Sequence, residues 1–105
     1  MRDALVVFVT APNEETAVKV ARCVVEEKLA ACVNIVSNVR SIYRWQGKIE
    51  DESELLLVIK TRQERFKALR ERVKALHTYT VPEIIALPVT DGLEEYLAWL
   101  KEETA

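Results

Sequence analysis

Two uninterrupted apolar runs constrain this chain more than any other feature. The first extends from Ala4 to Val9 and the second from Leu55 to Ile59, and neither contains a polar residue. Runs of β-branched and aliphatic residues without polar alternation are typical of strands that are covered on both faces. Both runs are far shorter than the roughly 18 apolar residues of a membrane-spanning helix. We therefore predict two central strands in a sheet that is covered on both sides.

Two other segments have the period of amphipathic helices. Asn13 is a suitable N-cap for the first helix, with Glu14 and Glu15 in the first turn, where negative charge suits the helix dipole. Apolar residues then recur at steps of three and four until an end near Lys28 to Ala30, and again from Phe66 to Leu76. We predict two helices with one buried face each.

The segment between these helices is expected to form a long β-hairpin. β-branched and aromatic residues are frequent from Ala31 to Trp45, Gln46-Gly47 provides a turn, and Lys48 begins a return strand that closes with the second apolar run. About 14 residues per strand span roughly 46 Å, whereas a helix of about 16 residues covers only about 24 Å. The hairpin tip would overhang the domain, so we predict that its aromatic residues Tyr43 and Trp45 contact another subunit.

The end of the chain completes a βαββαβ order. Glu83 to Val89 is predicted to be the fourth strand, with Pro88 at a sheet edge or a strand end, and Leu93 to Leu100 a short closing helix. We predict one α+β domain over residues 1–105, a ferredoxin-like sandwich with strand order 4-1-3-2 and both main helices on one face.

Such a sandwich leaves one face of its sheet open, and in this chain that face is apolar. The short closing helix covers only part of it, and the protruding hairpin exposes a strand edge. We therefore expect self-association. Because different patches of the subunit would meet, a closed ring is favoured over a two-fold dimer.

Charge and cysteine content restrict the function. Fifteen basic against seventeen acidic residues give a net charge of −2, so we expect no nucleic-acid partner. The start of the chain has no signal-peptide pattern, which favours a cytoplasmic protein without membrane insertion. Cys23 and Cys32 match no redox or zinc spacing, and we expect both to be small buried hydrophobes.

Catalysis is not expected. His77 is the only histidine, and no nucleophile can be paired with it. Ala11-Pro12-Asn13 lacks the arginine-bearing phosphate loop of the acylphosphatases, and the two central strands lack the exposed aromatic residues of RNA-recognition domains. We therefore predict no catalytic residues and no bound cofactor that serves a reaction.

Several motifs, in order along nearly the whole chain, resemble the CutA divalent-cation tolerance proteins. They are Thr10-Ala-Pro, Glu27-Lys-Leu-Ala-Ala-Cys32-Val-Asn34, Ser41-Ile-Tyr43-x-Trp45-x-Gly47-Lys48, Lys60-Thr61, Tyr79-x-x-Pro82-Glu83-Ile and Leu87-Pro-Val-Thr90. The resemblance implies a cytoplasmic homotrimer of ferredoxin-like subunits, similar in architecture to the PII signalling proteins and linked to tolerance of copper and other divalent metals. It implies no enzymatic activity.

The resemblance also implies a copper site, which this sequence matches only in part. The positions of the family's cysteine and two adjacent histidines are Val9, Leu76 and His77 here. One imidazole alone cannot make a selective copper site. We predict at most a weak site for Cu²⁺ or another divalent cation, in which copies of His77 are joined by Glu83 or Asp51 of neighbouring subunits. A helix-terminal histidine favoured by the dipole is the alternative.

Three further interpretations concern charged residues and the hairpin base. The acidic run Glu50, Asp51, Glu52 and Glu54 either attracts cations or, as we expect, forms a solvated strand face that pairs with Arg40 and Arg44 across the hairpin. Lys60, Arg62 and Arg65 could recognise an anion near the start of the second helix. As an alternative function, a PII-like protein would bind a small-molecule effector between subunits, near Tyr79, Glu83 and the hairpin base.

Overall fold

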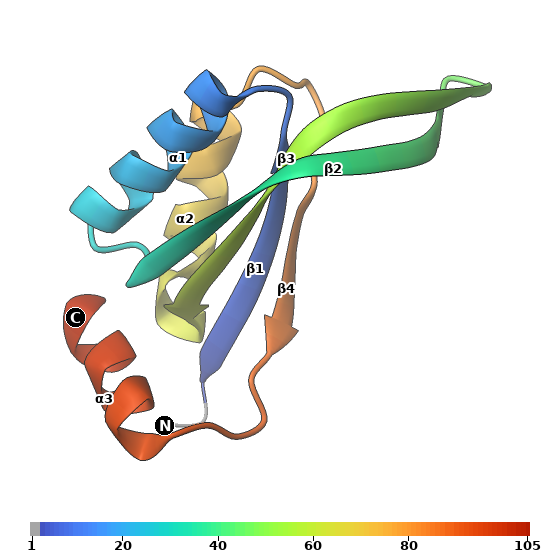
Figure 1. The fold of residues 1–105 in the computed structure, drawn as a ribbon. Helices are drawn as coiled ribbons and strands as arrows, with labels where there is room; N and C mark the ends of the chain where they lie inside the picture. Colours follow the sequence, from blue (N-terminus) through green and yellow to red (C-terminus); the bar gives the residue numbers. More distant parts are fainter. Residues whose placement is uncertain (1–2) are drawn as a thin grey trace.

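The computed structural model describes residues 3–105, which form a four-stranded antiparallel sheet and three helices (Figure 1). The strands lie in the order β2-β3-β1-β4, which confirms the predicted strand order. The elements are β1 (Ala4–Ala11), α1 (Glu14–Glu26), β2 (Cys32–Trp45), β3 (Lys48–Arg62), α2 (Gln63–Leu76), β4 (Ile84–Pro88) and α3 (Glu94–Glu103).

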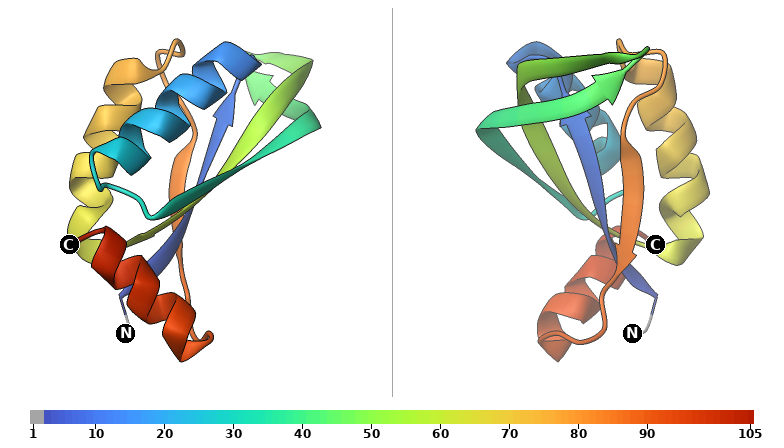
Figure 2. Two further views of the ribbon diagram at one scale, coloured as in Figure 1. Left: turned by 60° about the vertical axis from the view of Figure 1, so that its left-hand side comes forward. Right: turned by 90° about the vertical axis from the view of Figure 1, so that its right-hand side faces the viewer.

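The main core lies between one face of the sheet and helices α1 and α2, which cover the same side (Figure 2). The predicted apolar stripes of both helices are buried there, as are alternate residues of the two central strands. Apolar side chains in this layer with no exposed surface include Val7, Val9, Val20, Val24, Leu57, Ile59, Leu69 and Val73.

Helix α1 begins as predicted and ends earlier than predicted. The Asn13 side chain accepts a hydrogen bond of 2.8 Å from the Thr16 backbone N–H. The helix ends at Glu26, because Lys28 takes a left-handed φ of 60° and the N–H groups of Leu29 and Ala30 turn back to the Val24 carbonyl. The predicted end at Lys28 to Ala30 is therefore wrong, although Leu29 still packs in the core.

Strand β3 extends beyond the predicted end at Ile59. Its last residues, Lys60 to Arg62, pair with Val6, Leu5 and Ala4 of β1. At this end of the sheet α3 packs Leu100 against Ala4 and Ala31. Because Ala4 and Phe8 lie on the same face of β1, the closing helix covers only one end of the open face (Figure 2).

A β-bulge bends the hairpin where it leaves the sheet. Val36 pairs with Leu56 and Val39 with Glu54, so β2 contains one residue more than β3 over this stretch. Asn38, within the bulge, has a left-handed φ of 61°. Beyond the bulge the hairpin projects past the helices, as the chain lengths predict (Figure 1).

The open face of the sheet is apolar, as predicted. Phe8 and Val58 in the central strands are only partly buried, and on the edge strand Ile85 and Leu87 are 52% and 46% exposed. Residues directly opposite one another in antiparallel strands share a face, and the pairs Phe8–Ile85 and Phe8–Val58 place these side chains together. Coverage of this face by another subunit stays a prediction.

Three smaller expectations have definite outcomes. Pro88 is the last residue of the edge strand β4, as predicted. Cys23 and Cys32 are each partly exposed, so the prediction that both are buried is wrong: their helix and strand faces border the core without entering it. Within residues 3–105 no helix is long and apolar enough to cross a membrane.

Candidate functional site

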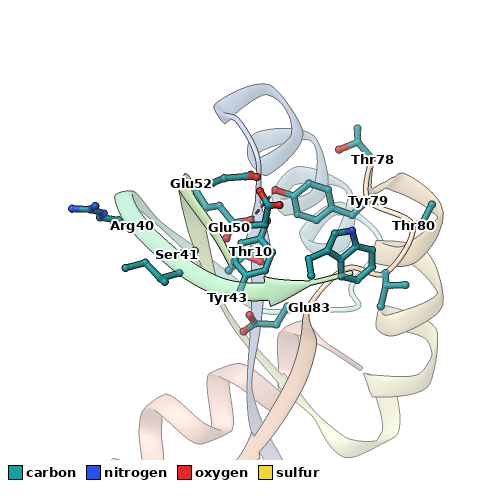
Figure 3. A pocket seen from close by; sticks show the side chains of 14 residues that line it. Thr10, Arg40, Ser41, Tyr43, Glu50, Glu52, Thr78, Tyr79, Thr80 and Glu83 are labelled. Carbon is teal, nitrogen blue, oxygen red and sulfur yellow. Dashed lines mark hydrogen bonds between the residues drawn. The ribbon is translucent and has the colours of Figure 1, made fainter. Parts of the chain in front are cut away.

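A pocket of about 910 Å³ lies at the base of the hairpin, enclosed by three parts of the chain (Figure 3). Strand β1 contributes Thr10, the outer half of the hairpin forms one wall, and the loop from Thr78 to Glu83 forms the other. The bulge in β2 lies just before the part of the hairpin that lines this pocket.

The walls of the pocket are rich in carboxylates. Alternation along β3 brings Glu50, Glu52 and Glu54 to one face of the strand, and Glu83 joins them from the loop before β4. Among the ion pairs of residues 3–105, none involves any of these four glutamates. The pocket therefore carries a concentrated negative charge.

Glu54 is the most buried of these acids, with only 5% of its surface exposed. The Tyr79 hydroxyl donates a hydrogen bond of 2.8 Å to Glu54 Oε2. The prediction of a solvated strand face or an ion pair with arginine is therefore wrong for Glu54. The contact joins residues 25 apart in the chain, so only the fold brings them together.

Arg40 is the one basic residue among those of residues 3–105 that border the pocket, and it is already paired. Its Nε and Nη2 donate to the two carboxylate oxygens of Asp51 at 2.8 and 2.7 Å, and its side chain points away from the pocket (Figure 3). This pair confirms the predicted cross-hairpin partner of Arg40, and the hydrogen bond lowers the pKa of Asp51. Arg44 has no ion pair within residues 3–105.

The carboxylates perturb the titratable groups around them. Burial raises the pKa of Tyr79, and the hydrogen bond and negative charge of Glu54 raise it further, so the phenol remains a neutral donor. Glu83 is exposed over much of its surface, yet the pocket wall removes enough water from its carboxyl to raise its pKa, and the charge of Glu54 adds to this. In both shifts burial is the larger cause, and the negative charge of Glu54 adds to it.

His77 lies behind the pocket wall and is not one of its lining residues. The residue is 8% exposed, with Nε2 2.7 Å from the Thr10 carbonyl oxygen and Nδ1 accepting a 3.0 Å hydrogen bond from the Tyr79 N–H. These partners assign the proton to Nε2 of a neutral ring. The imidazole thus fixes the backbone that carries Tyr79, and a metal ion would have to displace one of the two bonds.

The other predicted metal positions are dispersed. Val9 is in the core and Leu76 packs against it, whereas Glu83 lines the pocket. In residues 3–105 no group of three or more His, Cys, Asp or Glu side chains is arranged to hold a metal ion. A single chain therefore provides carboxylates for a cation without a complete set of metal ligands.

The predicted subunit contacts and the anion site can also be located. Tyr43 and Trp45 line the pocket and are 37% and 43% exposed. Buried Arg62 donates to the Thr104 hydroxyl and carbonyl at 2.9 and 3.0 Å, and Arg65 donates to the same carbonyl at 2.7 Å. Two of the three basic residues proposed for anion recognition instead hold the end of α3.

Comparisons with known proteins agree on one family. Residues 5–103 match the model of the CutA1 divalent ion tolerance protein family. The divalent-cation tolerance protein CutA of Thermus thermophilus is 59% identical over 94% of this chain and 96% of its own length.

Solved structures of such proteins superpose closely on the fold. A divalent cation tolerance protein from Thermus thermophilus matches with a TM-score of 0.95 and 57% identity, covering 97% of this chain and 99% of that one. The "periplasmic divalent cation tolerance protein CutA" of Archaeoglobus fulgidus matches with a TM-score of 0.94 and 43% identity, covering 97% and 99%.

Proposed function

The chain belongs to the CutA1 divalent ion tolerance family, and from this premise we propose that it acts in the response to copper and other divalent ions as a homotrimer of ferredoxin-like subunits. The observation that supports this most is the pocket at the hairpin base, where four glutamates have no ion-pair partner within residues 3–105. Carboxylate oxygens are ligands for divalent cations, and their unbalanced charge attracts any cation.

Subunit assembly would complete the cation site. One chain presents no three-ligand cluster within residues 3–105, so we propose that Glu83 of one subunit acts together with groups of its neighbour, at low affinity. His77 would contribute only by releasing Thr10 or Tyr79. Copper prefers nitrogen and sulfur ligands, and a site made mainly of carboxylates therefore binds it weakly.

A calorimetric titration with Cu²⁺ tests this role. We expect Glu83→Gln to weaken binding several-fold, whereas the matched control Glu71→Gln, on the exposed side of α2, should leave it unchanged. His77→Ala separates the two predicted ligands: an isotherm identical to that of the native chain removes His77 from the site. Equal binding by Glu83→Gln and the native chain would refute the proposed site.

Assembly itself is supported by the exposed apolar face of the sheet. We expect light scattering after size exclusion to give the mass of three chains for the native protein. Ile85→Asp places a charge on this face, at the edge strand β4, and should reduce the mass to that of one chain, because a buried unpaired charge is costly. Lys67→Asp, on the exposed side of α2, is the control. A native chain that is monomeric at micromolar concentration would exclude the trimer.

A PII-like role with a small-molecule effector is the second candidate, and the pocket favours it. Its volume of about 910 Å³ suits a small organic ligand. Its lining includes Tyr79, Glu83 and the hairpin base, which are the residues proposed to border an effector between subunits. A thermal-shift screen of metabolites tests this candidate. We propose binding without catalysis in this pocket. A cytoplasmic location of the protein remains a prediction.

A further inference from the structure

We propose that α3 is a hinged lid on one end of the open face: it undocks and redocks as a unit while the rest of the domain stays folded, and Arg62 sets how often it is closed. The inference concerns a movement within one chain and goes beyond the divalent-ion role. Three features support it: a small separate core beneath α3, arginine side chains that hold one end of the helix, and an exposed linker at the other end.

The core beneath α3 is small. Of the ten residues of α3, all in the described part of the chain, only Leu100 is buried. It packs against Ala4 and Ala31 in a cluster separate from the main core, and partly buried Val89 and Leu97 border this cluster. Segments with few buried apolar contacts open locally at a lower free energy than the whole domain. The helix can therefore leave without disturbing the main core.

Two arginines hold the end of α3. Buried Arg62 and partly buried Arg65 both donate to the Thr104 carbonyl, and Arg62 also donates to the Thr104 hydroxyl. That hydroxyl donates in turn to the Leu100 carbonyl at 2.9 Å, which connects these bonds to the buried residue of the helix. Within residues 3–105, no ion pair and no hydrogen bond between main-chain groups joins α3 to the sheet. The guanidinium of Arg62 also pairs with Glu64 at 2.7 Å, so its charge keeps a partner when α3 leaves.

An exposed linker joins the other end of α3 to the sheet. The Val89 N–H donates to the Ala4 carbonyl at 3.0 Å, which fixes the chain up to that point. Residues 90–93 follow and are all exposed. Within residues 3–105 they make no hydrogen bond to the sheet, and the Gly92 N–H donates to Asp91 Oδ1 inside the linker. Such a linker can absorb the change in backbone angles that a hinge requires.

The movement would change the apolar surface that the open face presents. Ala4 lies on the same face of β1 as Phe8, and Leu100 covers it when α3 is docked. Undocking exposes Ala4 and Ala31 and lengthens the apolar part of this face. The position of α3 thus regulates how much apolar surface is available to a second copy of the chain. This consequence rests on the proposed assembly, whereas the movement itself does not.

Hydrogen exchange of the native protein, followed by mass spectrometry, tests the movement. We expect the amides of α3 to exchange much faster than those of β1 and β3, because a detached helix of this length does not stay folded. Their exchange rate should hardly change in low urea, since local opening exposes little surface. Arg62→Met removes the bonds to Thr104 and should accelerate exchange in α3 about tenfold or more. The matched control is Arg72→Met, which removes an ion pair with Glu27 and should leave exchange in α3 unchanged.

Two results would overturn the inference. One is exchange in α3 as slow and as dependent on urea as in β1 and β3, which is also expected if a neighbouring subunit covers the exposed Tyr96 and Trp99. The other is unchanged exchange in α3 of Arg62→Met. If that variant does not fold, Thr104→Val replaces it and should accelerate exchange about threefold or more, because it removes the hydroxyl bonds. A monomeric native chain with fast exchange in α3 would remove the proposed assembly and leave the movement intact.

Discussion

Leu56 and Leu57 are neighbours in β3, yet they lie on opposite faces of the sheet and in different surroundings. Leu57 is completely buried under α1 and α2, whereas Leu56, on the open face, retains exposed surface. Both faces of the central strands are equally apolar in sequence, but one subunit covers only one of them. An apolar strand face in the sequence therefore indicates a face that must be covered. The helices of one chain are enough to cover only one of the two faces.

The largest expected effect compares these two leucines directly. Leu57→Ala should lower the free energy of unfolding by about 2–5 kcal/mol, because it leaves a cavity in a closed core. Leu56→Ala should cost less in a dilute sample and more as protein concentration rises, because assembly is what buries this side chain. Urea unfolding at two protein concentrations measures both. If the two variants lose the same unfolding free energy at every protein concentration, the proposed difference between the two faces is contradicted.

The next effect concerns the polar end of the open face. Tyr79→Phe removes the only hydrogen bond that residues 3–105 make to the buried Glu54 carboxylate and should lower the free energy of unfolding by about 1–3 kcal/mol. The same change in a Glu54→Gln background should cost less, because an unpartnered amide is cheaper to bury than a carboxylate. Urea denaturation of the four proteins gives the coupling between the residues. Strictly additive losses would show that the contact contributes nothing.

The smallest effect is the pH dependence of Glu83. Its pKa in the folded protein lies above the ordinary 4.5, through burial and then the charge of Glu54. The folded state therefore takes up a proton before the unfolded state as pH falls, so the free energy of unfolding increases as pH drops through the raised pKa toward 4.5. Glu83→Gln should remove this increase while leaving stability at neutral pH equal or slightly higher. Unfolding curves measured across this pH range test the prediction. If the unfolding free energy of Glu83→Gln depends on pH as it does in the native chain, the assignment to Glu83 is contradicted.

Much of the fold can be predicted from the sequence, because the spacing of apolar residues indicates each helix and strand separately. The stripes on α1 and α2 and the length of the hairpin follow from patterns within single segments, and the strand order follows from the βαββαβ order of the elements. The ends of α1 and β3 differ from the predictions because tertiary contacts set them: Leu29 turns into the core, and Lys60 to Arg62 pair with β1. The acidic run is visible in the sequence, but the burial of Glu54 is not, since it depends on Tyr79 in a distant loop.

The extra residue in β2 gives the folding hairpin two competing ways to pair. If the register of Val36 with Leu56 simply continued without the bulge, Arg40 would lie opposite Glu52 and Ile42 opposite Glu50. That misaligned hairpin would neutralise its own acids with arginine and would turn Tyr43 to the other side. Asn38 tolerates the left-handed backbone that the bulge requires better than most residues do. As the hairpin forms, this asparagine thus helps to decide whether the pocket retains its negative charge.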